Sequence, residues 1–261
     1  MLKLANSIVT KAKKYCEQVG LYFPKLKPPF KLAQVPDSSH ATKNSSYAQE
    51  GVLILLMPDK HLRVTTLKNT PHYSELQCGE EDLSDFCHII AHVSHKAKRI
   101  SSSTSTSETL AAVLGKELGQ LVALRLTEVL SAGIQLPMRS TASLSQLIAI
   151  QENAEWCVPI DHYSDCRDLF QLLVGEKGVP QDRYQRLYIL SLREDRLKTA
   201  IRHVLWIPTS GMVSDALTKS MLSCILYDLL THGYWRCKCK NDKPLLASKL
   251  VTKPYSEADL L

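Results

Sequence analysis

Four acidic residues stand where an apolar, strand-like run ends or where a helix begins: Asp37, Glu108, Asp165 and Asp215. Side-chain carboxylates are hard oxygen ligands, which Mg²⁺ prefers, and this ion usually keeps several waters and binds a few carboxylates together with substrate phosphates. A cluster of carboxylates without supporting His or Cys therefore suits chemistry on phosphodiesters. These residues predict a divalent-metal site, provided that the fold brings all four together.

Each acid also has a structural interpretation that involves no ligand. Glu108 follows Ser105 with the spacing of a capping box, and Asp165 could act as an N-cap. Asp37 could close an Asx turn, and Asp215 falls in the first turn of an expected helix, where the helix dipole favours an acid. Convergence of the four side chains is the feature that would distinguish a metal site from separate helix and turn signals.

The elements that must position these acids follow from the apolar patterns. Strands are predicted at 30–35, 51–57, 86–93, 158–163 and 203–207. The run at 51–57 is apolar throughout, which is typical of a strand covered on both faces, whereas the polar stretch 59–85 indicates a long loop. Asp37 and Asp165 would then follow the carboxyl ends of strands, where open α/β sheets build their sites.

Helical spacing of apolar residues predicts a long helix from near Ser105 and shorter helices at 143–152, 167–173, 183–201 and 212–231. One side of the long helix carries small residues after Glu108, namely Ala111, Ala112, Gly115 and Gly119. This side can lie close against a sheet and would carry Glu108 inward. The order of strands and helices predicts an α/β fold with a mixed five-stranded sheet flanked by helices.

The length and composition predict one main domain. The chain has 261 residues, of which 44% are hydrophobic and 22% are charged, enough to bury one substantial core. We expect a leader helix and linker at 1–29, the main domain at 30–233 and a tail at 234–261. The formal net charge of +6 is a modest excess in the direction of an anionic partner.

The eight cysteines follow no regular framework, and we expect them to be reduced thiols. The sequence contains no signal-peptide core and no apolar run of membrane-spanning length. We therefore expect a soluble, intracellular protein of the cytoplasm or nucleus, with no membrane partner. Two groups are candidate zinc ligands: Cys87 with His88, His92 and His95, and Cys237 with Cys239. Neither has the paired spacing that zinc sites favour, so we expect ordinary buried or surface side chains.

Three motifs are the most specific in the chain: SSSTSTSETLA at 101–111, SDCRDL at 164–169 and SDALTK at 214–219. Together with the segments that begin VPDSSHATKN at 35 and GEKGVPQDRYQ at 175, they resemble the ribonuclease H domain of copia-type LTR retrotransposon Pol polyproteins. The resemblance covers about residues 35–221 in the expected order. It implies a ribonuclease H-like fold and a metal-dependent endonuclease that hydrolyses the RNA strand of RNA:DNA hybrids, as part of a reverse transcriptase polyprotein.

By position, the resemblance places the metal-binding acids of the family on Asp37, Glu108, Asp165 and Asp215. Two Mg²⁺ ions are implied, with Mn²⁺ as a substitute, and no small-molecule cofactor. Asp37 would bridge the ions, Glu108 and Asp165 would bind one of them, and Asp215 would bind the other. The leader, with ANSIVTKAKKYCEQ at 5–18, is similar to the connection that follows the polymerase in such polyproteins, which implies an RNA:DNA hybrid and a polymerase domain as partners.

A hybrid substrate would also need contacts with its phosphates. Two groups of basic residues are candidates for nucleic-acid binding: Arg183, Arg186, Arg193 and Arg196 on one face of the helix 183–201, and Lys96, Lys98 and Arg99 after the third strand. A solvated face is the alternative for both groups, since Glu194 and Asp195 are interleaved with the arginines.

Two other functions are open from the sequence. The chain could be a catalytically inactive retroelement remnant that only binds nucleic acid, or it could be a structural connection module for a polymerase domain. Asp161 is also a rival for Asp165, because it lies four residues earlier on the same face of the strand. We rank Asp161 lower, since Asp165 ends the strand.

Overall fold

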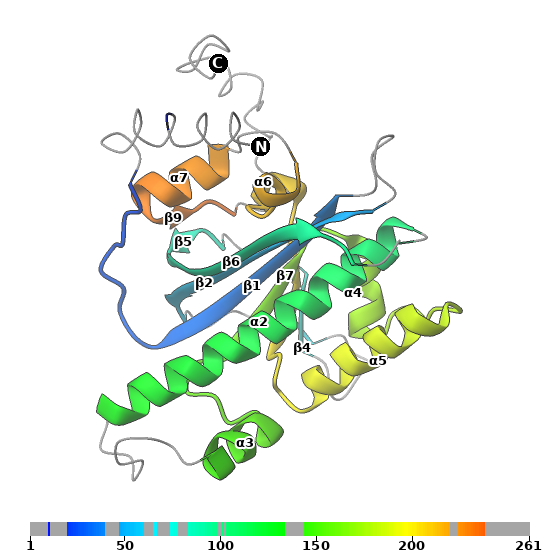
Figure 1. Cartoon of the computed structure of the whole chain (residues 1–261), viewed down its shortest axis with the longest axis horizontal. Helices are drawn as coiled ribbons and strands as arrows, with labels where there is room; N and C mark the ends of the chain where they lie inside the picture. The colour runs from blue at the N-terminus through cyan, green and yellow to red at the C-terminus, as the bar shows by residue number, and fades with distance from the viewer. Residues whose placement is uncertain are drawn as a thin grey trace.

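The chain is built around one mixed sheet (Figure 1). In the computed structural model the described residues are 10, 20–39, 47–59, 65–66, 74–77, 83–98, 101, 103–133, 144–219 and 224–237. The strands of the sheet are β1 (Phe30–Ser39), β2 (Gln49–Pro58), β3 (Thr65–Thr66), β4 (Ser74–Gln77), β6 (His88–Lys96), β7 (Ile160–Ser164) and β8 (His203–Trp206). Their order across the sheet is β3-β4-β8-β7-β1-β2-β6, and a separate ribbon pairs β5 (Asp85–Phe86) with β9 (Tyr234–Trp235).

Five of these strands form the predicted mixed sheet. β1 is antiparallel to β2 and β2 to β6, whereas β7 runs parallel to β1 and β8 runs parallel to β7. The α/β fold class predicted from the sequence is therefore confirmed. The predicted loop at 59–85 is wrong in part, because β4 pairs parallel with β8, β3 pairs with β4, and both extend the sheet at that edge.

β1 runs through Pro36 and Asp37, beyond the end that the sequence predicts. The N–H of Leu32 donates to the carbonyl of Pro159, with 2.8 Å between nitrogen and oxygen, so alternate backbone nitrogens of β1, including that of Pro36, face β7. Pairing between β1 and β7 ends at Gln34. Pro36 lies beyond the paired residues, so its lack of an N–H costs no hydrogen bond between β1 and β7. Asp37 therefore lies inside the strand, near its carboxyl end.

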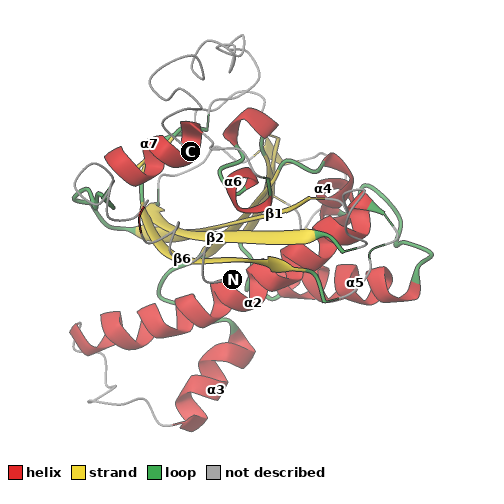
Figure 2. Cartoon of the chain, turned by 45° about the horizontal axis from the view of Figure 1, so that its top comes forward, coloured by secondary structure: helices red, strands yellow, loops and turns green. Residues whose placement is uncertain are grey.

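Helices cover both faces of the sheet (Figure 2). They are α2 (Thr104–Gly133), α3 (Leu144–Asn153), α4 (Arg167–Val174), α5 (Arg183–Leu197), α6 (Asp215–Thr218) and α7 (Cys224–His232), with a 3₁₀ turn at Thr209–Gly211. The single helix predicted at 212–231 is wrong in part, because α6 begins only at Asp215 and is separate from α7. No helix in the described part of the chain is long and apolar enough to cross a bilayer.

The two central strands supply alternate side chains to the two faces of the sheet, as the period of two residues in a strand requires. On one face, Leu55 of β2 joins a core that includes Leu229 of α7. On the other face, Ile54 packs in a core with Ala123 of α2. β2 is therefore covered on both sides, which confirms the interpretation of its continuous apolar run.

The small residues of α2 let this helix lie close against β1. Ala111 and Ala112 are completely buried. A Cβ atom at Gly119 would stand only 2.8 Å from Gln34 Oε1, whereas one at Gly115 would make an ordinary contact, 3.4 Å from Pro36 Cβ. The predicted close approach is confirmed, and it fixes the distance between the start of α2 and the carboxyl end of β1.

The packed domain continues past the predicted boundary at residue 233. Trp235 and Cys237 are completely buried in the core beside α7, and the indole N–H of Trp235 donates to the carbonyl of Gly211, 2.9 Å away. The linker is also attached, since the N–H of Tyr22 donates to the carbonyl of Leu230. Within the predicted leader and linker at 1–29, residues 1–19 lie outside the described residues apart from Thr10, and the tail beyond 237 lies outside them altogether.

Candidate functional site

Asp37 is the most central of the four acids. It faces Gly51 of β2 across the antiparallel pair, and its exposed fraction is only 3%. The hydroxyl of Thr218 in α6 donates a hydrogen bond to Asp37 Oδ2, which lowers the pKa of this carboxyl. Burial and then the charges of Asp215 and Asp165 outweigh that effect and raise the pKa to about 6. Three of the four predicted acids are therefore near neighbours.

Glu108 lies in the first turns of α2 and is also buried. Burial raises its pKa to about 8, with further contributions from the charges of Asp37 and Asp165. The capping-box interpretation does not hold, because the hydroxyl of Ser103, and not that of Ser105, accepts a backbone N–H in the first turn. Glu108 is left to face the acids at the end of the sheet.

Asp165 follows the last residue of β7, and burial is the main cause that raises its pKa. A hydrogen bond from Thr209 opposes the rise, and the charge of Asp215 adds to it. The N-cap position of α4 is held by Cys166, so Asp165 does not cap this helix. Asp215 is the first residue of α6 and forms an ion pair with Lys219.

The structure brings all four predicted acids into one electrostatic cluster at the carboxyl ends of β1 and β7. The carboxylates fit the oxygen donors that a divalent cation requires. As the side chains stand, however, no three His, Cys, Asp or Glu within the described residues form a group that could hold a metal ion. Donors of the chain itself engage all four carboxylates: Thr218 on Asp37, Ser38 on Glu108, Thr209 on Asp165 and Lys219 on Asp215.

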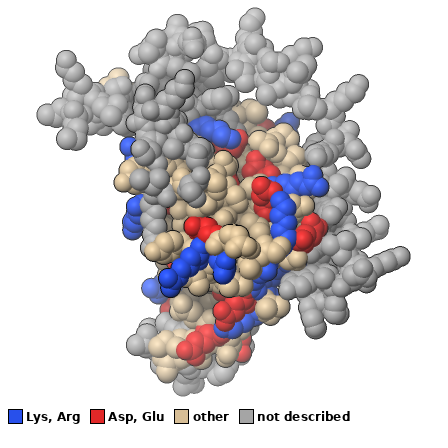
Figure 3. All heavy atoms as spheres, turned by 90° about the vertical axis from the view of Figure 1, so that its right-hand side faces the viewer, with Lys and Arg blue, Asp and Glu red and all other residues tan. Residues whose placement is uncertain are grey.

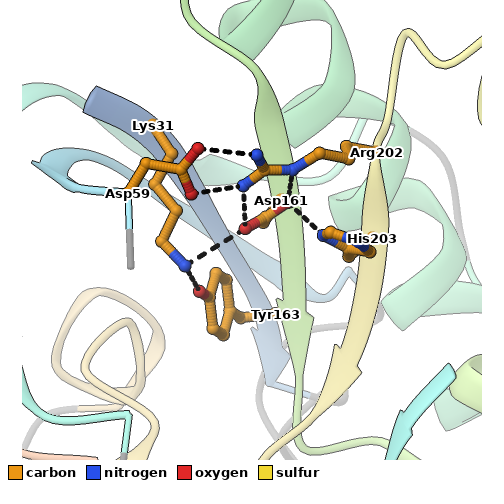
Figure 4. A network of polar contacts seen from close by, with 6 residues as sticks. All are labelled: Lys31, Asp59, Asp161, Tyr163, Arg202 and His203. Carbon is orange, nitrogen blue, oxygen red and sulfur yellow. Dashed lines mark hydrogen bonds and ion pairs between the residues drawn. The ribbon is translucent and has the colours of Figure 1, made fainter. Parts of the chain in front are cut away.

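Asp161 belongs to a different polar group (Figure 4). Its fully buried carboxylate lies 3.1 Å from Lys31 Nζ, 2.9 Å from Arg202 Nη2 and 3.0 Å from His203 Nδ1. Arg202 also binds Asp59 through two hydrogen bonds of 2.8 and 2.9 Å. Burial opposes ionisation, but these partners outweigh it and hold the pKa of Asp161 well below its ordinary value.

This network removes Asp161 as a rival for Asp165. Asp161 stands at the start of β7 and Asp165 just beyond its end, so about 13 Å of strand separates them. The carboxylate oxygens of Asp161 are already bound by Lys31, Arg202 and His203. No local pattern in the sequence indicates this network, because its members come from segments far apart along the chain.

The arginines of α5 lie largely against their own chain. Arg193 Nε donates to the carbonyl of Leu172 at 2.7 Å, and Arg196 Nη1 donates to that of Leu173 at 3.3 Å. Both arginines thus satisfy carbonyls at the end of α4, which have no partner within that helix. Arg196 is buried, and Arg186 donates to the carbonyls at 180 and 181. The burial of Arg196 argues against a phosphate contact for this residue.

Other members of the predicted basic groups are accessible. Arg183, Lys96 and Lys98 are exposed, whereas Arg99 lies outside the described residues. The face in Figure 3 carries basic and acidic side chains side by side, without one continuous basic patch. Contact between these residues and a nucleic acid stays a prediction.

The candidate zinc ligands have environments that do not suit a shared zinc ion. Cys87 is buried, and burial raises the pKa of its thiol to about 12, which disfavours the thiolate that zinc requires. His88 Nε2 lies 2.6 Å from the carbonyl oxygen of Pro24, while His92 is exposed on β6. Cys237 is buried in the core, and Cys239 lies outside the described residues.

Thr218, Thr209 and Lys219 contact the acidic cluster and are not among the residues predicted from the sequence. The first and last belong to the motif SDALTK, where they follow Asp215 by three and four residues, the spacing of neighbours on a helix. This spacing was a usable signal for an ion pair between Asp215 and Lys219. Thr209 precedes α6 in the 3₁₀ turn, and no pattern in the sequence points from it to Asp165.

No family model matches the chain, and no curated protein matches it. Among solved structures, it is similar to ribonuclease H1 of the archaeon Halobacterium salinarum, with 14% identity and a TM-score of 0.37 over 72% of this chain and 93% of that chain. It is similar to the N-terminal ribonuclease H domain of a Mycobacterium tuberculosis protein, with 12% identity and a TM-score of 0.37 over 73% and 91%. A ribonuclease H1 isolated from compost gives 13% identity and a TM-score of 0.38 over 75% and 98%.

Proposed function

We propose that this chain is a ribonuclease H-type, metal-dependent endonuclease that hydrolyses the RNA strand of RNA:DNA hybrids. The observation that carries the proposal is the convergence of Asp37, Glu108, Asp165 and Asp215 at one edge of a mixed α/β sheet. Four buried or half-buried carboxylates in one place are costly for a fold to keep together, and burial with neighbouring charges raises the pKa values of Asp37, Glu108 and Asp165. A function that needs concentrated negative charge accounts for them.

The four acids would hold divalent ions, and these ions, when bound, would supply an activated water and stabilise the leaving oxygen at phosphorus. The chain's own task is to hold the carboxylates in place and to release their protons. Thr218 orients the carboxylate of Asp37 through its hydrogen bond. Because Glu108 has a pKa of about 8, it must lose a proton before it can act as a ligand, and metal affinity should therefore rise with pH.

The proposed setting is a retrotransposon reverse transcriptase polyprotein inside a cell, with a polymerase domain as partner. Its support is the order of the motifs around Glu108, Asp165 and Asp215, which resembles that of copia-type polyproteins. Exposed Lys96, Lys98 and Arg183 are the proposed contacts for the hybrid backbone.

The test is incubation of the purified chain with a labelled RNA:DNA hybrid and Mg²⁺, beside two variants. Asp165→Asn removes a charge of the acidic cluster, and we expect at least about a hundredfold loss of cleavage. Asp168→Asn is the matched control, because Asp168 is an exposed acid in the first turn of α4, and it should cleave like the wild type. Circular dichroism would establish that each variant is folded.

An inactive retroelement remnant is the second candidate, and one observation favours it. As they stand, the acids are engaged by Thr218, Thr209 and Lys219 and do not form a ready metal group among the described residues. Failure of the folded wild type to cleave with either Mg²⁺ or Mn²⁺ would support this candidate. Binding of the hybrid without cleavage would then separate a nucleic-acid-binding remnant from a connection module.

A further inference from the structure

Lys219 places a positive charge against the acidic cluster. It is the C-cap residue of α6, and its ammonium forms an ion pair with Asp215 Oδ1, four residues earlier. Its charge also lowers the pKa values of Asp37 in β1 and of Asp165, which follows β7. One ammonium group therefore acts on three of the four carboxylates.

The side chain of Lys219 can also rotate away from Asp215 into solvent. Its exposed fraction is 44%, compared with 21% for Asp215, so part of it already lies in water. Lysine has a flexible four-carbon stem and a compact charge that water solvates strongly. Rotation of this stem into solvent would break the ion pair and leave the backbone of α6 where it is.

We propose that Lys219 is the internal counter-ion of the acidic cluster and that a divalent cation must displace its ammonium from Asp215 in order to bind. The inference rests on the proposed function, because it assumes that these acids take up a metal ion. It accounts for two features together: the acids are gathered at one edge of the sheet, and yet they stand without an arrangement ready for a metal ion.

The competition has a direct consequence for metal affinity. A divalent ion that binds the cluster is repelled by the nearby ammonium and must also compete with it for Asp215. Removal of that single charge should strengthen Mg²⁺ binding by roughly tenfold, the Coulomb effect of a unit charge about 6 Å from a divalent ion in water. The same change should lower the thermal stability of the metal-free protein, because the carboxylates lose their counter-ion.

The experiment compares Lys219→Met with the wild type in a calorimetric titration with Mg²⁺ and in thermal unfolding of the metal-free protein. We expect the Kd for Mg²⁺ to fall roughly tenfold, and the metal-free Tm to fall by about 3 °C. Neither readout depends on cleavage. Lys219→Arg keeps the charge and should stay close to the wild type in both measurements.

Lys198→Met is the matched control. Lys198 follows Glu194 by four residues on α5 and forms an exposed ion pair of the same kind, away from the acidic cluster. This variant changes the net charge equally but should bind Mg²⁺ like the wild type. A Kd in Lys219→Met equal to that of Lys198→Met would overturn the proposed competition and leave the nuclease proposal intact. Absence of Mg²⁺ binding in every variant would instead overturn both proposals.

Discussion

At the scale of single residues, burial sets the protonation of the acidic cluster before any ligand arrives. Glu108 has a pKa of about 8 and Asp37 one of about 6, against ordinary values of 4.5 and 3.8. Both shifts come first from the loss of water around the carboxyl groups and then from neighbouring acids. Near neutral pH the metal-free cluster therefore holds protons that the unfolded chain would release.

This difference makes the stability of the metal-free protein depend on pH. For Glu108 the unfolded chain loses its proton near pH 4.5 and the folded chain near pH 8, so the fold loses stability as pH rises between these values. Buried His162 acts in the opposite direction, but only between about pH 4 and 6.5, because burial lowers its pKa to about 4. Between pH 6.5 and 8 Glu108 therefore contributes more to the change than Asp37, whose folded pKa of about 6 lies below this interval.

We predict that the free energy of unfolding of the metal-free wild type falls by about 2 kcal/mol from pH 6.5 to pH 8. Glu108→Gln removes the titrating group at nearly constant volume, so its unfolding free energy should change much less over this interval. Urea unfolding at the two pH values measures the difference. An equal fall in both proteins would show that another group is responsible.

At the scale of elements, the site depends on how closely α6 approaches β2. A Cβ atom at Gly51 would stand 2.8 Å from both Leu217 Cβ and Thr218 Cγ2. Leu217 Cβ is fixed to the backbone and cannot rotate away, so a larger residue at position 51 must push α6 outward. Asp215 and Thr218 would move with it, away from Asp37.

We therefore predict that Gly51→Ala destabilises the protein by about 1–3 kcal/mol and weakens Mg²⁺ binding. Gly115→Ala is the matched control, because its Cβ would make only an ordinary contact of 3.4 Å with Pro36. In the middle of α2 this change should be neutral or stabilise by up to about 1 kcal/mol, as alanine favours helix over glycine. Urea unfolding and calorimetric titration would test both variants, and equal losses in the two would contradict the prediction.

At the scale of the whole molecule, β1 and β7 carry polar groups at both of their ends. The starts of these strands hold the network of Lys31 and Asp161, in which buried charges of opposite sign satisfy one another. Their carboxyl ends hold Asp37 and Asp165, where charges of the same sign meet. One end therefore contributes to the stability of the fold, and the other is the end suited to a ligand.

Mutations at the two ends of these strands should have different effects on stability and on cleavage. Asp161→Asn leaves the buried Lys31 without its acid and should cost about 3–5 kcal/mol of unfolding free energy, while cleavage persists at temperatures where the variant is folded. Asp165→Asn should show the reverse, with cleavage lost and the fold kept. Chemical denaturation and the hybrid cleavage assay give the two readouts. Loss of cleavage in folded Asp161→Asn would assign this residue to the site after all.

The fold class, the main strands and the long helix could be predicted from the sequence, because apolar periodicity reveals each of them within one segment, and the positions of the four acids at element ends could be seen in the same way. The continuous apolar run of β2, the small residues of α2 and the acids at element ends each needed only near neighbours in the chain. The extension of β1 through Pro36 was not predictable in this way, since it depends on which side β7 pairs with and where that pairing stops.

Which charged side chains meet could not be predicted from local patterns, because it depends on how distant segments pack together. Asp161 and Asp165 look alike in the sequence, yet Lys31, Arg202 and His203 converge on the first, whereas other acids converge on the second. In the tertiary structure, Arg193 and Arg196 of α5 also donate to carbonyls of α4, and Thr218 donates to Asp37. Apolar periodicity is local and can be seen in one segment, but the energy of a charge depends on the burial and partners that distant segments bring to it.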